Sequence, residues 1–170
     1  MKILCVIDMQ NDFIDGALGT KEAVSILGAV KDKIKKYKAN GDLIVFTRDT
    51  HYENYMETAE GKKLPVAHCI EGTNGHQIHS SLNTHDCEII DKPTFGSLKL
   101  ADAIREIEDL ESIELIGLCT DICVISNALL LKANFPEVKI VIDSSCCAGV
   151  TPESHENALK AMAMCQIEIT

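Results

Sequence analysis

The sequence has no apolar run that approaches the roughly 20 residues needed to cross a bilayer, and its longest apolar stretches lie near Leu4 and Leu129. It is also poor in basic residues, with 16 Lys and Arg against 26 Asp and Glu, which gives a formal net charge of -10. Such a charge repels a phosphate backbone and an anionic lipid surface alike. We therefore expect neither nucleic acid nor membrane as a partner.

The first residues, Met1 to Asp8, lack the basic region, long apolar stretch and cleavage site of a signal peptide, so we expect a cytoplasmic protein. Most of the eight cysteines lie inside apolar runs, where reduced thiols serve as small buried residues rather than as a disulfide framework. Cys119 and Cys123 are spaced CxxxC rather than CxxC. This spacing argues against a thioredoxin-like redox pair and against a zinc ribbon.

Internal repeats and low-complexity linkers are absent, and a chain of 170 residues with 46% apolar and 25% charged side chains fits one domain spanning 1–170. Within it, short β-branched runs alternate with helical patterns, which indicates a parallel α/β fold. The expected strands are residues 2–8, 42–48, 87–91, 113–118, 138–143 and 165–170.

Apolar residues at helical spacing predict four helices between these strands. Asn40-Gly41 is expected to end the first helix, Ser97 to cap the second, and Thr151-Pro152 to begin the fourth. The predicted buried faces are Val24, Leu27, Val30, Ile34 and Tyr37; Leu100, Ile104 and Ile107; Val124, Ala128 and Leu131; and residues 158–162.

Residues 49–86 break this rhythm, because they show no sustained strand or helix period. Long irregular loops in compact domains are often functional. This loop holds five of the six histidines, although surface loops favour polar residues and chance clustering stays an alternative. Those histidines are His51, His68, His76, His79 and His85.

Chemically capable side chains follow several of the expected strands. In an open parallel sheet, the carboxyl ends of the strands meet at one edge, where ligands bind. The sequence therefore predicts that an acid, a base, a thiol and metal ligands converge there. These residues are Asp8, Asp49, His51, Lys92, Cys119 and Cys123.

Cys123 is expected in the first turn of a helix that opens at Thr120-Asp121, where free amides and the helix dipole favour an anion. We expect the pKa of its thiol to lie below the free value of about 8.5, and we expect Asp8 to accept its proton. From the residues alone, Cys123 as a small packing residue and Lys92 as a solvated lysine stay open. Asp8 ends an apolar strand and so needs a partner or a function.

Asp49-x-His51 places a carboxylate and an imidazole on one side of an extended segment, and His68 follows after a loop. A carboxylate with two imidazoles suits zinc, iron or manganese better than calcium, which prefers oxygen ligands. The residues therefore indicate a divalent metal site.

The ordered set of motifs resembles the nicotinamidase and isochorismatase-like cysteine hydrolases, over essentially the whole chain. The resemblance implies a three-layer α/β/α fold with a six-stranded, mainly parallel sheet of Rossmann-type topology, and a metal-site loop at 49–86. The matching motifs are DMQNDF (8–13), TRDTH (47–51), PVAHCIEGTNG (65–75), DKPTFGS (91–97), GLCTDICV (117–124) and DSSCCAGVTPESH (143–155).

Carried over by position, the family's catalytic triad falls on Asp8, Lys92 and Cys123. The resemblance also implies an oxyanion hole built from the backbone amides of Cys119 and Cys123. A non-proline cis peptide between Leu118 and Cys119 is expected with it.

The nicotinamidase branch binds a divalent metal, usually zinc, and its ligands match Asp49, His51 and His68. Zn²⁺ is the expected ion, with Fe²⁺ or Mn²⁺ as alternatives. Of the two nearby acids that could add a further ligand, Glu60 is preferred over Glu57. Metal-free branches lack the trio, which argues against an isochorismatase.

The resemblance implies a nicotinamidase, which converts nicotinamide and water to nicotinate and ammonia through a cysteine thioester. Members commonly stack the pyridine ring between two aromatic residues. Phe13 matches the first, but the second position falls near Leu64 or Pro65, and the chain has no Trp. Another small amide or a carbamoyl compound is therefore the alternative substrate.

Two readings from other classes are a receiver-like signalling domain and a catalytically silent metal-binding relative. A receiver domain needs neither Cys123 nor the histidine-rich loop. Cys146 and Cys147 are expected to be packed small residues, with a place in the site as the alternative. The family habit of forming dimers and larger assemblies implies a homo-oligomer.

Overall fold

The computed structural model describes residues 1–170 and contains a central sheet of six strands, all parallel. The strand order is β3-β2-β1-β4-β5-β6, which confirms the predicted α/β class and its Rossmann-type order. The strands are β1 (Lys2–Ile7), β2 (Leu43–Asp49), β3 (Glu88–Lys92), β4 (Ser112–Leu118), β5 (Lys139–Ala148) and β6 (Glu168–Ile169).

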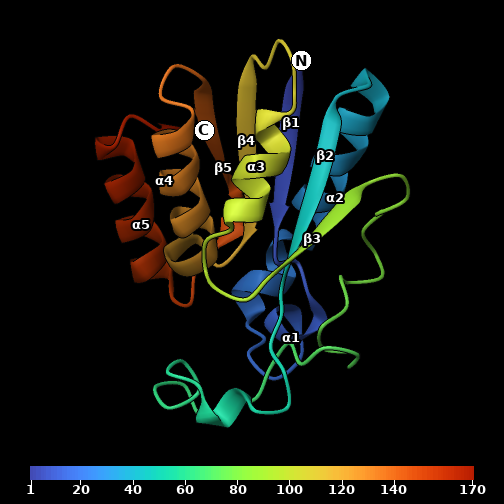
Figure 1. The fold of residues 1–170 in the computed structure, drawn as a ribbon, viewed down its shortest axis with the longest axis vertical. Coiled ribbons are helices and arrows are strands. Elements are labelled where there is room, and N and C mark those ends of the chain that lie inside the picture. The colour runs from blue at the N-terminus through green and yellow to red at the C-terminus, as the bar shows by residue number, and fades with distance from the viewer.

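Helices cover both faces of the sheet and make three layers (Figure 1). The long helix α2 lies behind the sheet in that view, and α3, α4 and α5 lie on the opposite face. The helical segments are α1 (Asn11–Ile14), α2 (Lys21–Asn40), the 3-10 turn η1 (Tyr55–Glu57), α3 (Leu98–Arg105), the π-helical turn η2 (Thr120–Val124), α4 (Ile125–Asn134) and α5 (Pro152–Met164).

Strand alternation divides the core between the two faces. On β1, Ile3, Cys5 and Ile7 pack toward α3, α4 and α5, whereas Leu4 and Val6 pack toward α2. Burying β1 on both faces explains why its sequence is an apolar run rather than an alternating pattern.

The expected helix boundaries are confirmed by side-chain caps and by a glycine. Ser97 and Thr151 each accept a hydrogen bond from the first turn of their helix, as expected, and Gly41 ends α2 in the left-handed conformation, with φ of 75°. Thr20 caps the start of α2 in the same way, although it was not among the expected caps. The predicted buried face of α2 is wrong at Val24, whose side chain is exposed. Ala23 and Ile26 lie toward the sheet instead.

The last two strands differ from the expected ranges. Strand β5 continues through Cys146 and Cys147 to Ala148, so those cysteines belong to a strand rather than to the loop before a helix. Strand β6 is shorter than predicted, because α5 runs to Met164 and Gln166 turns the chain with φ of 64°.

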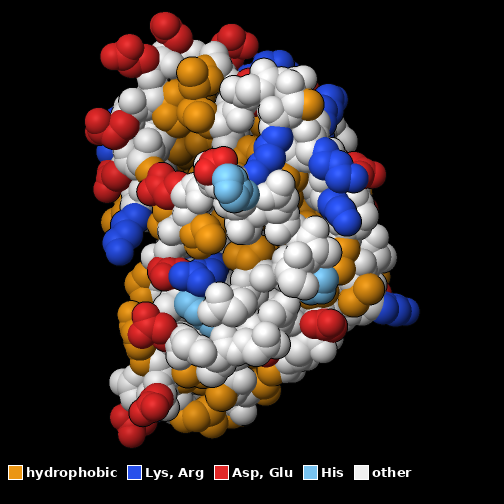
Figure 2. All heavy atoms as spheres, turned by 90° about the vertical axis from the view of Figure 1, so that its right-hand side faces the viewer, with side chains coloured by type: hydrophobic (Ala, Val, Ile, Leu, Met, Phe, Trp, Pro, Cys, Tyr) orange, Lys and Arg blue, Asp and Glu red, His pale blue; other side chains and the backbone are white.

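The chain between β2 and β3 projects beyond the carboxyl ends of the strands, at the lower end of Figure 1. Its regular structure is limited to η1 and two isolated bridges, one that pairs His51 with Ile70 and one that pairs Ile78 with Gln10. In Figure 2, the face bearing the β3 edge has acidic and basic side chains interspersed, with several separate hydrophobic patches. None of the helices combines the length and apolar character that a membrane-spanning segment requires.

Candidate active site

Asp8 follows the last residue of β1, at the point where the strand order reverses between β1 and β4. It is fully buried and has a φ of 47°, in the left-handed region, which aspartate tolerates better than most non-glycine residues. Thr47 holds its carboxylate, because Thr47 Oγ1 donates to Asp8 Oδ1 at 2.6 Å. Burial raises the pKa of Asp8, an effect that Lys92 opposes and Asp49 reinforces.

Lys92 ends β3, paired in register with Asp49 on β2. Its ammonium lies 2.6 Å from Asp8 Oδ2 and 3.4 Å from Cys123 Sγ, and it donates to Thr94 O at 3.1 Å. Burial lowers the pKa of Lys92, but the surrounding acids and Cys123 outweigh burial and hold it above its ordinary value. Lys92 is therefore a charged lysine inside the protein, not a solvated one.

Cys123 lies in η2, directly after β4, and its side chain is buried against the carboxyl edge of the sheet. The expectation of an easily ionised thiol is wrong for the free protein. Burial raises the pKa of Cys123 well above its ordinary value, Asp8 raises it further, and Lys92 opposes both. The raised pKa favours the neutral thiol in the free protein, so a nearby base has to take the proton as the sulfur attacks.

Cys119 stands between β4 and η2, and the peptide bond that precedes it is cis, as the resemblance implies. Its amide donates no hydrogen bond within the protein. Gly117, two residues earlier, has φ of 117°, and a side chain there would overlap the carbonyl oxygen of Ile7 at 2.1 Å. Glycine therefore lets the end of β4 approach β1 closely beside Asp8.

Four side chains from β2 and the following loop converge near the triad: Asp49, His51, Glu60 and His68. One ligand-type atom of each lies within 4.8 Å of all the others. His51 Nε2 is 2.8 Å from Asp49 Oδ2 and 3.7 Å from Glu60 Oε1. The acid preferred as the fourth ligand, Glu60, is in this group, whereas Glu57 is not.

The chemistry of these four residues fits a divalent cation. His51 Nε2 is buried, and its 2.8 Å contact with Asp49 Oδ2 does not have the geometry of a hydrogen bond. His68 Nδ1 pairs with the carbonyl oxygen of Val66 at 2.8 Å, which leaves His68 Nε2 facing the group. Burial opposes ionisation of Asp49, but the neighbouring imidazoles and Lys92 outweigh it and hold the pKa of Asp49 below its ordinary value. Two imidazoles and two carboxylates suit a first-row divalent metal.

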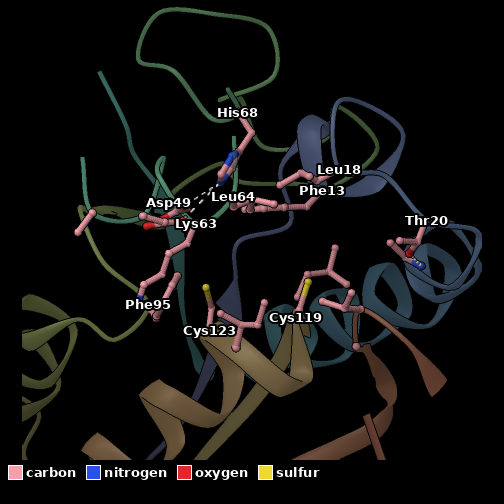
Figure 3. Close-up of a pocket in the computed structure, with 17 residues that line it drawn as sticks. Phe13, Leu18, Thr20, Asp49, Lys63, Leu64, His68, Phe95, Cys119 and Cys123 are labelled. Carbon is pink, nitrogen blue, oxygen red and sulfur yellow. Dashed lines mark hydrogen bonds and ion pairs between the residues drawn. The ribbon is translucent and has the colours of Figure 1, made fainter. Parts of the chain in front are cut away.

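A cavity of about 570 Å³ extends from Cys123 to Asp49, Glu60 and His68 of the metal-ligating group. In Figure 3, Cys119 and Cys123 present their sulfur atoms from one side, while His68, Phe13 and Leu64 lie opposite. The predicted substrate-binding residues Phe13 and Leu64 both line this cavity. Its walls are mainly apolar, which suits a flat organic molecule with one polar end.

The sequence reasoning missed Phe95 as part of this cavity. Phe95 lies in the segment between β3 and α3, and it lines the cavity on the same side as Cys123 (Figure 3). The available signal was an aromatic residue inside the DKPTFGS motif, three residues after Lys92. Its side chain stays 43% exposed, as expected at the mouth of a binding site.

Gln10, in the DMQNDF motif, was also missed. Its side-chain amide accepts from Asp49 N at 2.7 Å, donates to Asp49 O at 2.8 Å and donates to His76 O at 2.9 Å. A fully buried glutamine that joins three strand and loop ends fixes the backbone beneath the metal-ligating group.

The remaining candidates lie outside the site. Cys146 and Cys147 are buried in β5 and do not line the cavity. His76 is also buried, with its Nε2 2.8 Å from Thr50 Oγ1, while the imidazole of His85 is exposed.

The fold and the site together describe a three-layer α/β protein with a buried thiol beside a lysine and a carboxylate, and comparison with known proteins identifies the family. The isochorismatase domain matches residues 2–170, so the chain belongs to the isochorismatase domain family. An isochorismatase family protein of Bacillus subtilis (strain 168), PncA, is 30% identical over 176 residues, covering 95% of this chain and 94% of that protein.

Solved structures agree with this assignment. The zinc complex of a pyrazinamidase from Pyrococcus horikoshii has a TM-score of 0.88 and 30% identity, with 99% of this chain and 98% of that chain covered. A pyrazinamidase/nicotinamidase from Streptococcus mutans has a TM-score of 0.88 and 29% identity, with both chains fully covered. Because the chain belongs to this family, the alternative of a receiver-like signalling domain is wrong.

Proposed function

We propose that this protein is a nicotinamidase, which hydrolyses nicotinamide to nicotinate and ammonia through a thioester on Cys123. The main support is a single cavity that is lined by Cys123, Asp49 and His68 and otherwise has mainly apolar walls. Relatives named pyrazinamidase and nicotinamidase support the substrate class.

In the first half of the reaction, the Cys123 sulfur attacks the carboxamide carbon while its proton passes to Asp8. A carbon-sulfur bond forms, and the carbonyl π electrons move onto oxygen. The raised pKa of Asp8 suits it to accept this proton. The backbone amides of Cys119 and Cys123 are assigned to stabilise the oxyanion, a role in which one lost donor typically costs about 100-fold to 1000-fold in rate.

The intermediate collapses when Asp8 returns the proton to the amide nitrogen, the carbon-nitrogen bond breaks and ammonia leaves. Water then attacks the thioester and gives a proton to Asp8. The carbon-sulfur bond breaks, the acid is released and the proton returns to Cys123. Lys92, 2.6 Å from Asp8 and 3.4 Å from Cys123, balances the negative charge that passes between them.

Asp49, His51, Glu60 and His68 are the residues that would hold a divalent cation, and zinc is the ion we propose. When bound, the cation supplies a Lewis-acidic position that can anchor the pyridine nitrogen and orient water. Asp49, Glu60 and His68 line that end of the cavity and keep it polar, which orients the amide end of the ring toward Cys123.

Phe13, Leu64 and Phe95 are the proposed walls for the pyridine ring. Leu64 stands where an aromatic residue is common in nicotinamidases, and this departure favours the second candidate, a different small amide or a carbamoyl compound. A cytoplasmic setting, one domain over 1–170 and a homo-oligomer stay predictions beside this proposal.

Ammonia release from nicotinamide by the purified protein tests the proposal, with a chelator-treated sample and Cys123→Ala beside it. We expect release that both treatments abolish. Hydrolysis of other small amides while nicotinamide is untouched would keep the triad and replace the substrate. No hydrolysis of any amide by the metal-loaded protein would support the catalytically silent relative.

A further inference from the structure

Asn127 is a buried polar residue in α4, one helical turn after Cys123, and its side chain does not line the cavity. Its amide nitrogen donates to Phe95 O at 3.0 Å and to Cys123 O at 2.8 Å. Its amide oxygen accepts from Ser97 N at 2.9 Å. These three hydrogen bonds use both amide protons and one lone pair of the oxygen.

The segment that Asn127 grips has little else to hold it. Residues 93–96 take part in no backbone-to-backbone hydrogen bond, and the other polar contact to their backbone is from Lys92 Nζ to Thr94 O. Asn127 spans this segment, since it binds the carbonyl of Phe95 and the amide of Ser97, the residue that caps α3.

We propose that Asn127 is a positioning residue, which fixes Phe95 relative to Cys123 so that the Phe95 ring forms the second aromatic wall of the substrate cavity. The inference rests on the proposed amidase function and identifies a residue that sets the affinity of the cavity for the substrate ring. Leu64 cannot stack on a ring as an aromatic residue does, so the wall facing Phe13 must come from elsewhere, and Phe95 is the other phenylalanine on the cavity.

The chemistry of the contact explains why a neutral amide stands here. Two partners of Asn127 are carbonyl oxygens and the third is an amide N–H. Aspartate would still accept from Ser97 but could donate to neither carbonyl, and would set a buried negative charge against both. Alanine would leave all three groups without this partner.

A double-mutant cycle on nicotinamide hydrolysis tests the proposal with metal-loaded protein: wild type, Asn127→Ala, Phe95→Ala and the double variant. We expect Asn127→Ala to raise KM about tenfold with kcat changed less than about threefold, and to raise KM less than about twofold once Phe95 is already alanine. Asn127→Ser, which keeps one hydroxyl donor, should fall between wild type and alanine and serves if Asn127→Ala folds poorly.

Asn134→Ala is the matched control, because Asn134 also lies on α4 and donates to the carbonyl four residues earlier, Leu130 O, at 2.8 Å. It should leave KM unchanged. A structural role alone would lower thermal stability and change KM equally in both Phe95 backgrounds, and that outcome overturns the proposal.

Two further measurements distinguish a failure of the positioning role of Asn127 from a failure of the proposed function. Hydrogen exchange at the Ser97 amide should speed up in Asn127→Ala, and the rate of Cys123 alkylation by iodoacetamide, followed on its peptide, should not change. The proposed positioning role is contradicted if exchange at the Ser97 amide is unchanged, or if alkylation of Cys123 slows in the same variant that raises KM. If wild type releases no ammonia from nicotinamide, the proposed function fails instead, whatever the exchange data show.

Discussion

The ammonium of Lys92 lies 3.3 Å from Asp49 Oδ1, so one buried lysine contacts the metal-ligating group as well as Asp8 and Cys123. The register of the sheet produces this contact, because Asp49 and Lys92 are paired at the ends of β2 and β3. The charge balance of the candidate triad and that of the metal site are therefore linked through a single side chain.

Replacing Lys92 by methionine should damage both stability and activity. The change leaves Asp8 and Asp49 buried without their shared cation, and breaking such a pair typically costs about 3 to 5 kcal/mol. We expect the free energy of unfolding in urea to fall by an amount in that range and kcat to fall by at least about 1000-fold. Wild-type stability in Lys92→Met would contradict the charged, buried lysine described here.

Cys123→Ala should abolish ammonia release, whereas Cys119→Ala should keep most of it. The proposed oxyanion contribution of Cys119 comes from its backbone amide, which alanine retains. Ammonia release and acid-quenched mass spectrometry check this, since the wild type should carry a thioester adduct on Cys123 during turnover. Comparable losses in the two variants would mean that the Cys119 side chain takes part in the chemistry.

Metal content should separate the two glutamates of the loop. Glu60→Gln should weaken divalent metal retention by about 10-fold to 100-fold, because Glu60 Oε1 lies 3.7 Å from His51 Nε2 within the ligand group. Glu57→Gln should retain metal like the wild type, since Glu57 lies outside that group. Metal measured after dialysis against a graded chelator distinguishes them, and equal retention by both variants would remove Glu60 from the site.

Much of the site could be predicted because parallel strands bring their carboxyl ends to one edge. Asp8, Lys92 and Cys123 lie at or shortly after the carboxyl ends of strands β1, β3 and β4, so the order of strands in the sequence was enough to predict that they meet. The walls of the cavity depend instead on how long segments fold over that edge. The position of Phe95 depends on a hydrogen bond from Asn127, 32 residues later, which no local pattern reveals.

The pKa of Cys123 illustrates a second limit. Its place near a helix start can be read from the sequence, and that place alone favours ionisation. The depth of burial depends on the packing of η2 against the sheet and α5, and burial is the larger effect on Cys123. The sequence can therefore identify a feature that lowers the pKa of Cys123, such as the start of a helix. It cannot give the direction of the total pKa shift, which depends on burial.

Lys33→Met should destabilise the fold away from the site, and more so at neutral than at acidic pH. Lys33 Nζ lies 2.6 Å from Glu114 Oε1 and 2.7 Å from Asp143 Oδ2 beneath the sheet, and its removal should cost roughly 3 kcal/mol at pH 7.

The direction of this pH dependence follows from Asp143. Burial opposes its ionisation, but Lys33 and Ser145 outweigh burial and lower the pKa of Asp143. A lowered pKa in the folded state stabilises the protein above the unfolded value of about 3.9 and is lost as the pH falls through the folded value. The difference in unfolding free energy between wild type and Lys33→Met should therefore be full above about pH 5 and shrink toward pH 3.

Lys35→Met is the control on the same helix, because Lys35 pairs with Asp32 in solvent and should change stability by less than about 1 kcal/mol. A difference that stays constant from pH 7 to pH 3 would mean that the Asp143 carboxylate does not depend on Lys33.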